Sequence, residues 1–329
     1  MADATATGGS DYTAISGIQT LNIAPNTQSK NIPISILTDS VDEDNETITV
    51  TLTSAVNATI ARAAGTLTIQ DDDNQPSIVI NDFTANNESA STITIPVSLT
   101  TPTSRTVTAT YETKSGTAVA GNDFAYKTGT ITFQPNQSTT SFDLSLIDDQ
   151  LNENTEQFTI EITNASNATA PSSNPTVTIP DDDQLSISVS DNLTIANEGV
   201  GTHGVIVTLS NASTDNITVS YSTNNITASG VDYSLSGNGT LTFPAGTTTQ
   251  TLTVTVIDDN FNEGPETFEL ALSNATGGAT ISDPNNTITI LDDDGDPTVT
   301  ISDVSVSEAD PAVNVAITLS YPSPGNVIV

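Results

Sequence analysis

The chain contains many short stretches in which polar and apolar residues alternate. Threonine alternates with isoleucine, valine or leucine over residues 47–52, 251–256 and 298–301. Successive side chains of a β-strand point to opposite faces, so this alternation predicts strands with one buried face and one exposed face. Turn-forming residues separate the stretches, as at Pro135-Asn136 and Gly277-Gly278. No stretch has a convincing helical period, and the sequence therefore predicts an all-β protein.

Several sequence markers recur at spacings of 110 or 111 residues. Three consecutive aspartates occupy residues 71–73, and the triplet returns at 181–183 and 292–294. Single glutamates follow the same period, as do loops in which a glycine precedes an aspartate and an aromatic residue. A repeat of about 110 residues with several short strands has the size of one antiparallel β-sandwich. The period therefore predicts β-sandwiches in tandem.

The register of the repeats divides the chain into four segments. The first is the C-terminal part of a repeat, the second and third are complete, and the fourth is the N-terminal part of a repeat: residues 1–73, 76–183, 184–294 and 297–329. Residues 326–329 match 216–219, and the start of the chain resumes near the equivalent of Ser222. Two interpretations follow. Either the chain is a window from a longer repeat protein, or the fourth segment of one copy completes the first segment of the next by strand complementation, which builds a filament.

The charge of the chain excludes several classes of partner. It has 40 acidic and 5 basic side chains, and its formal net charge is −35. Such a polyanion repels nucleic-acid phosphates and anionic membrane surfaces. Cysteine is absent and His203 is the single histidine, which argues against a disulfide framework, cysteine-ligated zinc and histidine-based catalysis. No apolar run reaches the length of a membrane-spanning helix.

A glycine-containing stretch at residues 199–204 matches the dinucleotide-binding pattern G-x-G-x-x-G. That pattern needs a helix after its glycines, because the N-terminus of the helix holds the pyrophosphate. Residues 205–209 have the composition of a strand instead. We therefore interpret the match as a chance feature of a turn.

Four motifs together resemble one known family. They are Gly-Ser-Asp-Tyr-Thr at 9–13, Ile-Asp-Asp-Asn-Phe-Asn-Glu at 257–263, Glu-Thr-Phe at 266–268 and Ile-Leu-Asp-Asp-Asp at 290–294. The chain resembles the Calx-beta family, a module of sodium/calcium exchangers, integrin β4 and many bacterial surface proteins. The resemblance covers almost the whole chain. It implies an immunoglobulin-like antiparallel β-sandwich and, in calcium-binding members, a cluster of ions held by loops at one end.

The resemblance also implies which acidic residues would bind Ca²⁺ in each repeat. In the third segment they are Glu198, Asp232, Asp258, Asp259, Glu263, Asp292, Asp293 and Asp294. In the second they are Glu88, Asp123, Asp148, Asp149, Glu153, Asp181, Asp182 and Asp183. In the first they are Asp11, Asp39, Glu43, Asp71, Asp72 and Asp73. The first segment lacks the early glutamate, which Glu308 of a preceding segment would supply, and Thr38 replaces one aspartate.

Calcium suits these residues chemically. It takes six to eight oxygen ligands, mostly carboxylates and carbonyls. Two like charges 4 Å apart repel each other by roughly 4 kcal/mol at an effective dielectric constant near 20, so gathered carboxylates need a counterion or a proton. A bound ion would also fix the linker that carries each aspartate triplet. The alternative is that the acids are solvated spacers that keep neighbouring modules apart.

These features predict a non-enzymatic structural protein, because an enzyme would not need the same acids in every repeat. We expect an extracellular stalk or fibre on a microbial cell surface, stiffened by calcium, whose partners are neighbouring repeats or copies joined end to end. Nucleic-acid binding and membrane insertion of this segment are not expected. Three alternatives stay open: a filament subunit with self-completing ends, an adhesin segment that binds a glycan, receptor or matrix ligand directly, and a spacer attached to an enzyme located elsewhere.

Overall fold

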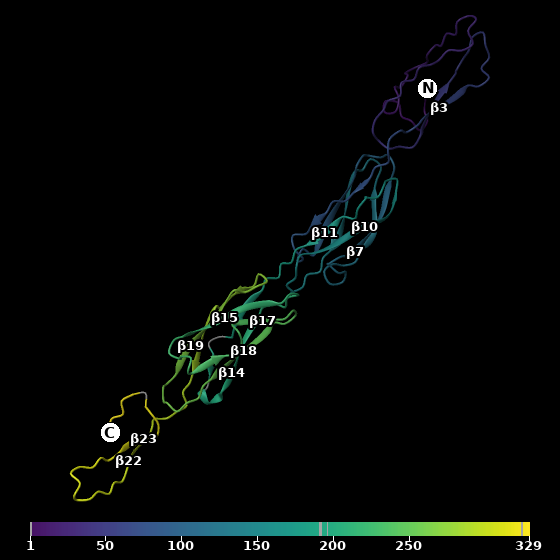
Figure 1. The fold of residues 1–329 in the computed structure, drawn as a ribbon. Helices are drawn as coiled ribbons and strands as arrows, with labels where there is room; N and C mark the ends of the chain where they lie inside the picture. Colours follow the sequence, from purple (N-terminus) through teal and green to yellow (C-terminus); the bar gives the residue numbers. More distant parts are fainter. Residues whose placement is uncertain (1, 191–192, 196, 324) are drawn as a thin grey trace. The chain divides into compact units, whose positions relative to one another are not determined.

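The computed structural model describes residues 2–190, 193–195, 197–323 and 325–329 (Figure 1). The chain forms two compact units, one with residues 1–148 and 155–180 and the other with residues 149–154 and 181–329. Across the described ranges, the regular structure consists of β-strands and one 3₁₀ turn, without an α-helix. The prediction of an all-β protein is confirmed.

The second segment contains two sheets, which lie in the first compact unit. One sheet has the strand order β5 (Phe83–Thr84), β11 (Thr176–Ile179), β10 (Glu156–Ser166), β7 (Val107–Ser115) and β8 (Thr128–Phe133). The other contains β4 (Ile78–Val79), β6 (Thr92–Leu99) and β9 (Thr139–Ser145). All of these neighbours are antiparallel except β5 and β11.

The two sheets of the second segment share one core, which makes the segment a β-sandwich. Ile93, Ile95 and Val97 on β6 are buried, and the residues between them are exposed, as the alternating pattern requires. The core also contains two stacked phenylalanines, Phe124 and Phe158, with ring centroids 4.0 Å apart. Burying a large apolar side chain stabilises the fold by about 1.5–3 kcal/mol, so this inner face holds the sheets together.

The third segment is built in the same way within the second compact unit. One sheet has the order β16 (Tyr233–Leu235), β18 (Thr249–Val256), β14 (Thr202–Leu209), β12 (Ser186–Val189) and β20 (Thr280–Ile281). The other has the order β13 (Thr194–Ile195), β21 (Asn285–Ile290), β19 (Glu266–Ser273), β15 (Ile217–Asn225) and β17 (Thr240–Phe243). Buried residues of both sheets form one core. The 3₁₀ turn η1 (Glu198–Val200) leads into β14, so a strand follows the glycine-rich stretch, as expected.

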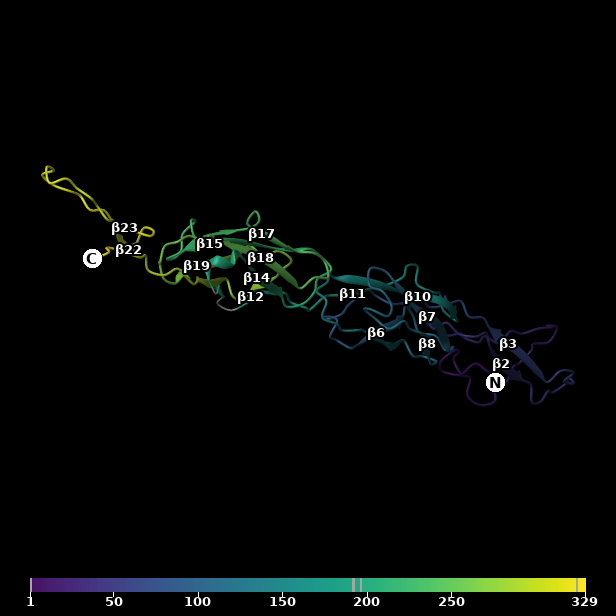
Figure 2. The same cartoon turned by 90° about the horizontal axis from the view of Figure 1, so that it is seen from below.

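The first and fourth segments have fewer paired strands. The first contains one sheet of β1 (Ala2–Asp3), β2 (Glu46–Thr51) and β3 (Ala64–Ile69), with a small core of Ala6, Tyr12 and Ile48. The fourth contains β22 (Val299–Ile301) and β23 (Ile317–Leu319), which pair with each other and with no further strand among the described residues (Figure 2). Both segments expose apolar side chains that complete repeats bury.

Candidate metal centres

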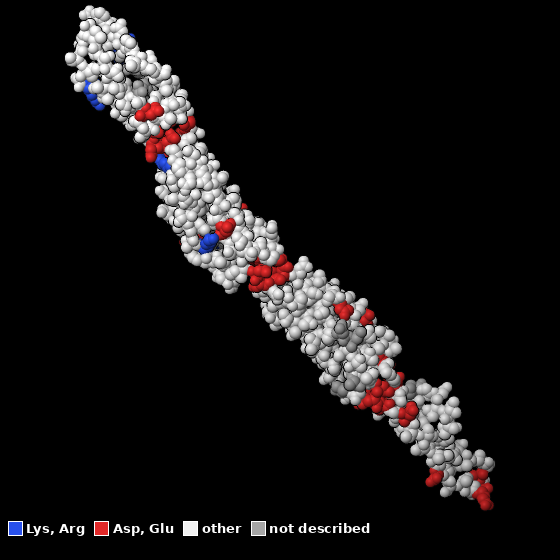
Figure 3. All heavy atoms as spheres, turned by 180° about the vertical axis from the view of Figure 1, so that it is seen from behind, with Lys and Arg blue, Asp and Glu red and all other residues white. Residues whose placement is uncertain are grey.

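Three loops of the third segment bring acidic side chains together. Glu198 lies in η1, Asp258 follows β18, and Asp293 follows β21. One carboxylate oxygen from each of these residues lies within 4.8 Å of the others. Glu198 is buried, whereas Asp258 and Asp293 reach solvent. Figure 3 shows acidic side chains gathered in patches with little charge on the surface between them. Residues that lie 35 or more positions apart in the sequence thus meet in one cluster.

Backbone hydrogen bonds fix the loops around Asp292. Its carboxylate accepts hydrogen bonds from the N–H groups of Glu263 at 3.2 Å and Asp294 at 3.2 Å. Asp259 accepts a hydrogen bond from the Phe261 N–H at 2.7 Å. These bonds orient the carboxylates of two loops before any ion binds, which lowers the entropy cost of assembling a site.

The cluster of the third segment fits a cation by two independent observations. Glu198 Oε1 and Asp294 Oδ2 are buried and have no hydrogen-bond partner among the described residues, and such buried acceptors are costly without a donor or a cation. A Cβ atom on Gly199 would lie 3.3 Å from Asp293 Oδ2, so glycine leaves space beside the carboxylates. Hard carboxylate oxygens are the ligands that calcium prefers.

Burial, together with neighbouring carboxylates, disfavours the ionised form of several acids of this cluster. Burial and a hydrogen bond with Asp292 raise the pKa of Glu198 to about 8. Burial and neighbouring aspartates also raise the pKa values of Glu263 and Asp294. For Asp292, burial acts in the same direction, but the backbone N–H groups together with Glu198 outweigh it and lower its pKa. A divalent cation would favour the ionised form of all these groups.

The recurring pair of an aspartate and an aromatic residue anchors one side of the cluster in the third segment. Asp232 accepts a hydrogen bond from the Ser229 N–H at 2.6 Å, which folds the loop around its carboxylate. The next residue, Tyr233, is buried and stacks on Phe268 with ring centroids 3.7 Å apart. The core therefore holds the aspartate in place. Asp123 and Asp11 are arranged alike and accept hydrogen bonds at 2.5 Å from residues 119 and 7.

Glu266 belongs to the third cluster although the ligand prediction omitted it. It is the first residue of β19. Burial, followed by the charges of Asp232 and Glu263, raises its pKa to about 7. The signal was present in the sequence, because a second glutamate follows three residues after Glu263 and recurs at the corresponding positions Glu156 and Glu46.

A similar cluster forms in the first segment. Carboxylate oxygens of Asp11, Glu43 and Glu46 lie within 4.8 Å of one another. Burial and a hydrogen bond with Asp11 raise the pKa of Glu46 to about 7. Burial also raises the pKa values of Glu43 and Asp73. One cavity is lined by the predicted acidic residues of this segment together with Thr38: Asp11, Asp39, Glu43, Asp71, Asp72 and Asp73.

The predicted ligands of the second segment are divided between the compact units. Glu88, Asp123 and Asp148 belong to the first unit, where Glu88 and Asp123 are buried; Asp149, Glu153, Asp181, Asp182 and Asp183 belong to the second. In the second unit, Asn152 Nδ2 donates hydrogen bonds to Asp181 Oδ2 at 3.0 Å and to the Asp183 carbonyl at 2.7 Å. Burial raises the pKa of Asp181. The ligand set of this repeat stays a prediction.

Glu308 is exposed in the fourth segment, in a turn between β22 and β23. It lies at the position that corresponds to Glu198, which is buried at 7% exposure in the third segment. Its expected role in completing another repeat stays a prediction.

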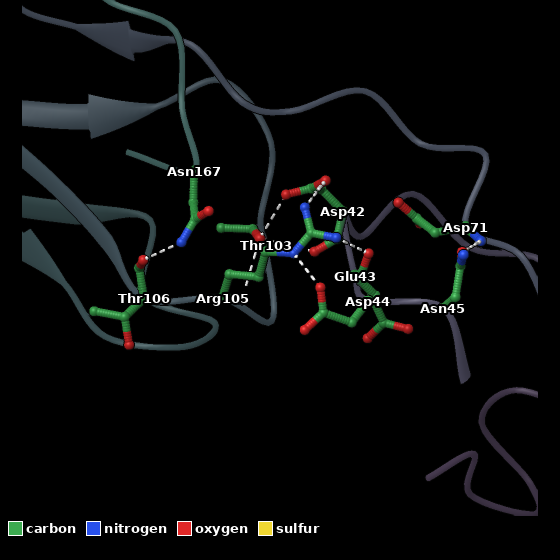
Figure 4. A network of polar contacts seen from close by, with 9 residues as sticks. All are labelled: Asp42, Glu43, Asp44, Asn45, Asp71, Thr103, Arg105, Thr106 and Asn167. Atoms are coloured by element: carbon green, nitrogen blue, oxygen red, sulfur yellow. Dashed lines mark hydrogen bonds and ion pairs between the residues drawn. The ribbon is translucent and has the colours of Figure 1, made fainter. Parts of the chain in front are cut away.

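A second kind of polar network lies beside the first cluster (Figure 4). Asp42 is 2% exposed and accepts hydrogen bonds from Thr103 Oγ1 and Arg105 Nη1, both at 2.9 Å. Arg105 also donates to Asp44 at 2.9 Å and to the Glu43 carbonyl. The network ties the loop of Glu43 to the second segment. Sequence reasoning missed it, because one residue of each pair lies some 60 positions from the other.

The corresponding positions in the second compact unit form an uncharged counterpart. Asn152 takes the place of Asp42 and Ser213 that of Thr103, each 110 positions later. Ser213 Oγ donates to Asn152 Oδ1 at 3.2 Å, and the Asn152 N–H donates to the Ala212 carbonyl at 2.9 Å. Both pairs form an isolated parallel β-bridge. The bridge is therefore a repeated feature, whereas the charge at its centre differs.

The fold and the acidic loops define the chain as an array of β-sandwich repeats with clustered carboxylates. The profile of the Calx-beta domain matches residues 1–73, 71–183 and 180–295, and the chain belongs to this family. Calx-beta is a calcium-binding type of domain. No helix among the described residues is long and apolar enough to cross a membrane.

Two curated relatives illustrate the range of proteins that share these repeats. Adhesion G-protein coupled receptor V1 of Danio rerio is 32% identical over 195 residues, covering 51% of this chain and 3% of the receptor. Sodium/calcium exchanger 2 of Homo sapiens is 31% identical over 182 residues, covering 49% of this chain and 20% of the exchanger. The chain thus spans a small part of either relative.

Two solved structures are also similar. Calcium binding domain CBD12 of CALX1.1 is 20% identical, with a TM-score of 0.34, and the match covers 64% of this chain and 98% of that structure. The apo form of the Calx CBD1 domain is 29% identical, with a TM-score of 0.32, and covers 33% of this chain and 100% of that structure.

Proposed function

We propose that the chain is a non-enzymatic structural segment of an extracellular protein, a stalk or fibre on a microbial surface that calcium stiffens. The observation that carries the proposal is the position of residues 292–294. They lie one residue beyond β21, Asp293 takes part in the cluster around Glu198, and the fourth segment begins at residue 297. An ion at this cluster would therefore hold the linker and the sandwich together.

Calcium would supply positive charge and flexible coordination by six to eight oxygens. In the third segment, Glu198, Asp258 and Asp293 would hold it, with Asp292 and the remaining acids of the cluster around them. The protein's own groups would position the ligands. Backbone N–H groups orient Asp292, and the buried Tyr233 positions Asp232. Without an ion, charge repulsion would loosen the loops.

Different observations support the proposed extracellular location and the proposed structural role. The same acids recur in each repeat, which suits a mechanical element better than a single active site. Each repeat of a tandem array contacts its neighbours along the chain, so stiffness depends on the joints. The net charge of −35 suits a solvated surface polymer whose copies repel one another and stay apart.

Calcium titration tests this proposal on the whole chain. Thermal melting, calorimetric binding and small-angle scattering would be measured at calcium concentrations up to and beyond about 1 mM, the weak end for extracellular modules. We expect a higher melting temperature and a longer, straighter particle. Asp258→Asn together with Asp293→Asn should remove the response of the third segment.

Asp303→Asn provides the matched control, because it removes one carboxylate from an exposed position of the fourth segment. It should leave the calcium response unchanged. Unaltered melting and scattering of the native chain at saturating calcium would show that the acids are solvated spacers.

A further inference from the structure

The turn between β16 and β17 contains the single Asn-Gly pair of the sequence, Asn238-Gly239. β16 lies in one sheet of the third segment and β17 in the other, so residues 236–239 cross from sheet to sheet. Asn238 is exposed, and the glycines on its two sides, Gly237 and Gly239, have φ values of +99° and +86°. Glycine adopts such values at little cost because it has no Cβ atom. The asparagine thus lies in an open turn between two glycines.

Tyr221 of β15 holds both ends of this turn. Its hydroxyl donates a hydrogen bond to the Ser236 carbonyl at 2.6 Å, and its N–H donates one to the Gly239 carbonyl at 2.9 Å. Tyr221 belongs to the buried core of the third segment, so the turn is fixed to a rigid part of the sandwich. Both of these anchors use carbonyl groups. Among the described residues, the Gly239 N–H donates no hydrogen bond, and its nitrogen is therefore available as a nucleophile.

The side chain of Asn238 is turned forward along the backbone. Its Oδ1 accepts a hydrogen bond from the Thr240 N–H at 3.3 Å, which directs the amide toward the residues that follow it, as in an Asx turn. A donor at Oδ1 also stabilises the negative charge that develops on this oxygen when a nucleophile attacks Cγ. The turn therefore supplies an exposed amide carbon, an adjacent N–H without a partner, and a donor for the developing charge.

We propose that Asn238 is a site of spontaneous modification, at which its amide becomes a carboxylate through a cyclic imide. The Gly239 nitrogen attacks Asn238 Cγ and closes a five-membered ring. The Cγ–Nδ2 bond breaks, and Nδ2 leaves as ammonia with the proton that the Gly239 nitrogen gives up. Water then opens the imide at one of its carbonyl carbons. Opening at Cγ gives aspartate, whereas opening at the main-chain carbonyl gives isoaspartate, in which the chain runs through Cβ and Cγ.

The modification would distinguish the third repeat from the second. In the second repeat, Thr128 occupies the corresponding position, 110 residues earlier, and Gly129 follows it. Threonine has no amide group and cannot form the imide. In the third repeat, the reaction adds a negative charge, and the isoaspartate product also adds one backbone atom to the connection between the two sheets. None of the candidate calcium ligands lies in this turn, so the proposal stands apart from the calcium function.

Incubation of the whole chain, followed by digestion with a protease that cleaves before aspartate, tests the site by mass spectrometry. The fragment 232–257 contains Asn238 as its single asparagine. Aspartate at this position creates a new cleavage point, whereas isoaspartate leaves the fragment whole but heavier by the difference between a hydroxyl and an amino group. The host that produces the chain should attach no N-glycans, because Asn238-Gly239-Thr240 is also an Asn-x-Thr sequence and a glycan would occupy Nδ2.

Asn136 is the matched control within the same digest. It is exposed in a turn, and the fragment 123–142 contains it as its single asparagine. Gln137 follows it, and the N–H of Gln137 already donates to a backbone carbonyl at 2.9 Å. The Cβ atom of Gln137 also hinders the attack, whereas glycine has none. We expect Asn238 to react about tenfold faster or more, which corresponds to a barrier lower by about 1.4 kcal/mol.

Two variants test the mechanism. Asn238→Thr, which copies the second repeat, should remove the modified fragment and show that Gln250 is not its source. Thr240→Pro removes the N–H that binds Oδ1, at the first residue of the edge strand β17, where proline is tolerated. It should slow the reaction, and an unchanged or faster rate would contradict assistance by Thr240. Thermal melting of each variant would show that it folds.

The comparison of Asn238 with Asn136 needs no variant, so it decides the proposal even where a substitution prevents folding. Equal rates at the two asparagines would overturn the proposal. An unmodified Asn238 in the folded chain, under conditions that modify it in the denatured chain, would also overturn it, because the turn would then protect the amide. The rate should rise with pH, since the Gly239 nitrogen must lose its proton to attack, and a rate that falls would contradict the imide route.

Discussion

Arg105 Nη1 lies 2.9 Å from the carboxylate of Asp42, an acid that is 2% exposed and 63 positions earlier in the chain. The same guanidinium contacts Asp44 and the Glu43 carbonyl. A single cation thus holds three consecutive residues of an acidic loop. Because Glu43 belongs to the first cluster, the ion pair positions a candidate calcium ligand.

Replacing this cation should destabilise the first segment. Arg105→Gln leaves the buried Asp42 carboxylate without its ionic partner, and we expect a loss of about 2–5 kcal/mol, as for other buried pairs that lose one member. Denaturant unfolding of the native and variant chains would measure it. Arg62→Gln is the control, since Arg62 is exposed and donates to one backbone carbonyl. Equal effects of the two substitutions would contradict a specific role for Arg105.

A charge introduced at the corresponding site should also destabilise the second compact unit. Asn152→Asp removes the two hydrogen bonds that Nδ2 donates and places a carboxylate beside Asp181. We expect a loss of about 1–3 kcal/mol in metal-free protein. Residue 215, the counterpart of Arg105, is an aspartate, so no cation is supplied there.

The double substitution Asn152→Asp with Asp215→Arg would recreate the charged network in the second unit. It should recover part of the lost stability, and a double-mutant cycle would give the coupling between the two positions. Additive losses would mean that the two networks are not equivalent.

Metal-free protein should become less stable as the pH rises. The folded pKa of Glu198 is about 8, raised by burial and by Asp292, and those of Glu46 and Glu266 are about 7. The unfolded chain releases these protons near pH 4.5, so the folded state binds more protons between that pH and about 8. Melting in the presence of a chelator at pH 5, 6.5 and 8 should show a falling melting temperature. Glu198→Gln should flatten the trend, whereas a melting temperature that rises over this range would contradict it.

Glu266→Gln should weaken calcium binding by the third segment about tenfold or more, as the loss of groups that support a metal site does. The reason is its place beside Asp232 and Glu263. Glu269→Gln is a control on the same strand, because its carboxylate accepts a hydrogen bond from Asn224 instead. Calorimetric titration would compare the two variants, and equal affinities would place Glu266 outside the site.

The alternating pattern predicted strands well wherever both sheets of a sandwich are present. Residues 251–256 lie within β18, and Leu252, Val254 and Val256 are buried as expected. Residues 298–301 have the same pattern, and 299–301 form β22, yet β22 is exposed along its whole length, because no second sheet covers it among the described residues. Local pattern fixes the strand, whereas burial depends on the partner sheet.

The gathering of these acids was predictable from the family resemblance, and its detail was not. The resemblance implied that Glu198, Asp258 and Asp293 belong to one set, and the structure brings them together. Glu266 was missed, although its recurrence at Glu156 and Glu46 is visible in the sequence. Asp42 and Arg105 were missed, because their contact depends on how two segments pack rather than on local sequence.

The parallel bridges at Asp42–Thr103 and Asn152–Ser213 span the same distance of 61 residues along the chain. Each bridge is therefore formed by residues of the two repeats that it joins. Duplication or loss of one whole repeat by recombination would form the same backbone bridge at the new junction, with the side chains that the two joined repeats supply. A gene of this design can gain or lose whole modules while the backbone bridge between neighbouring repeats is kept.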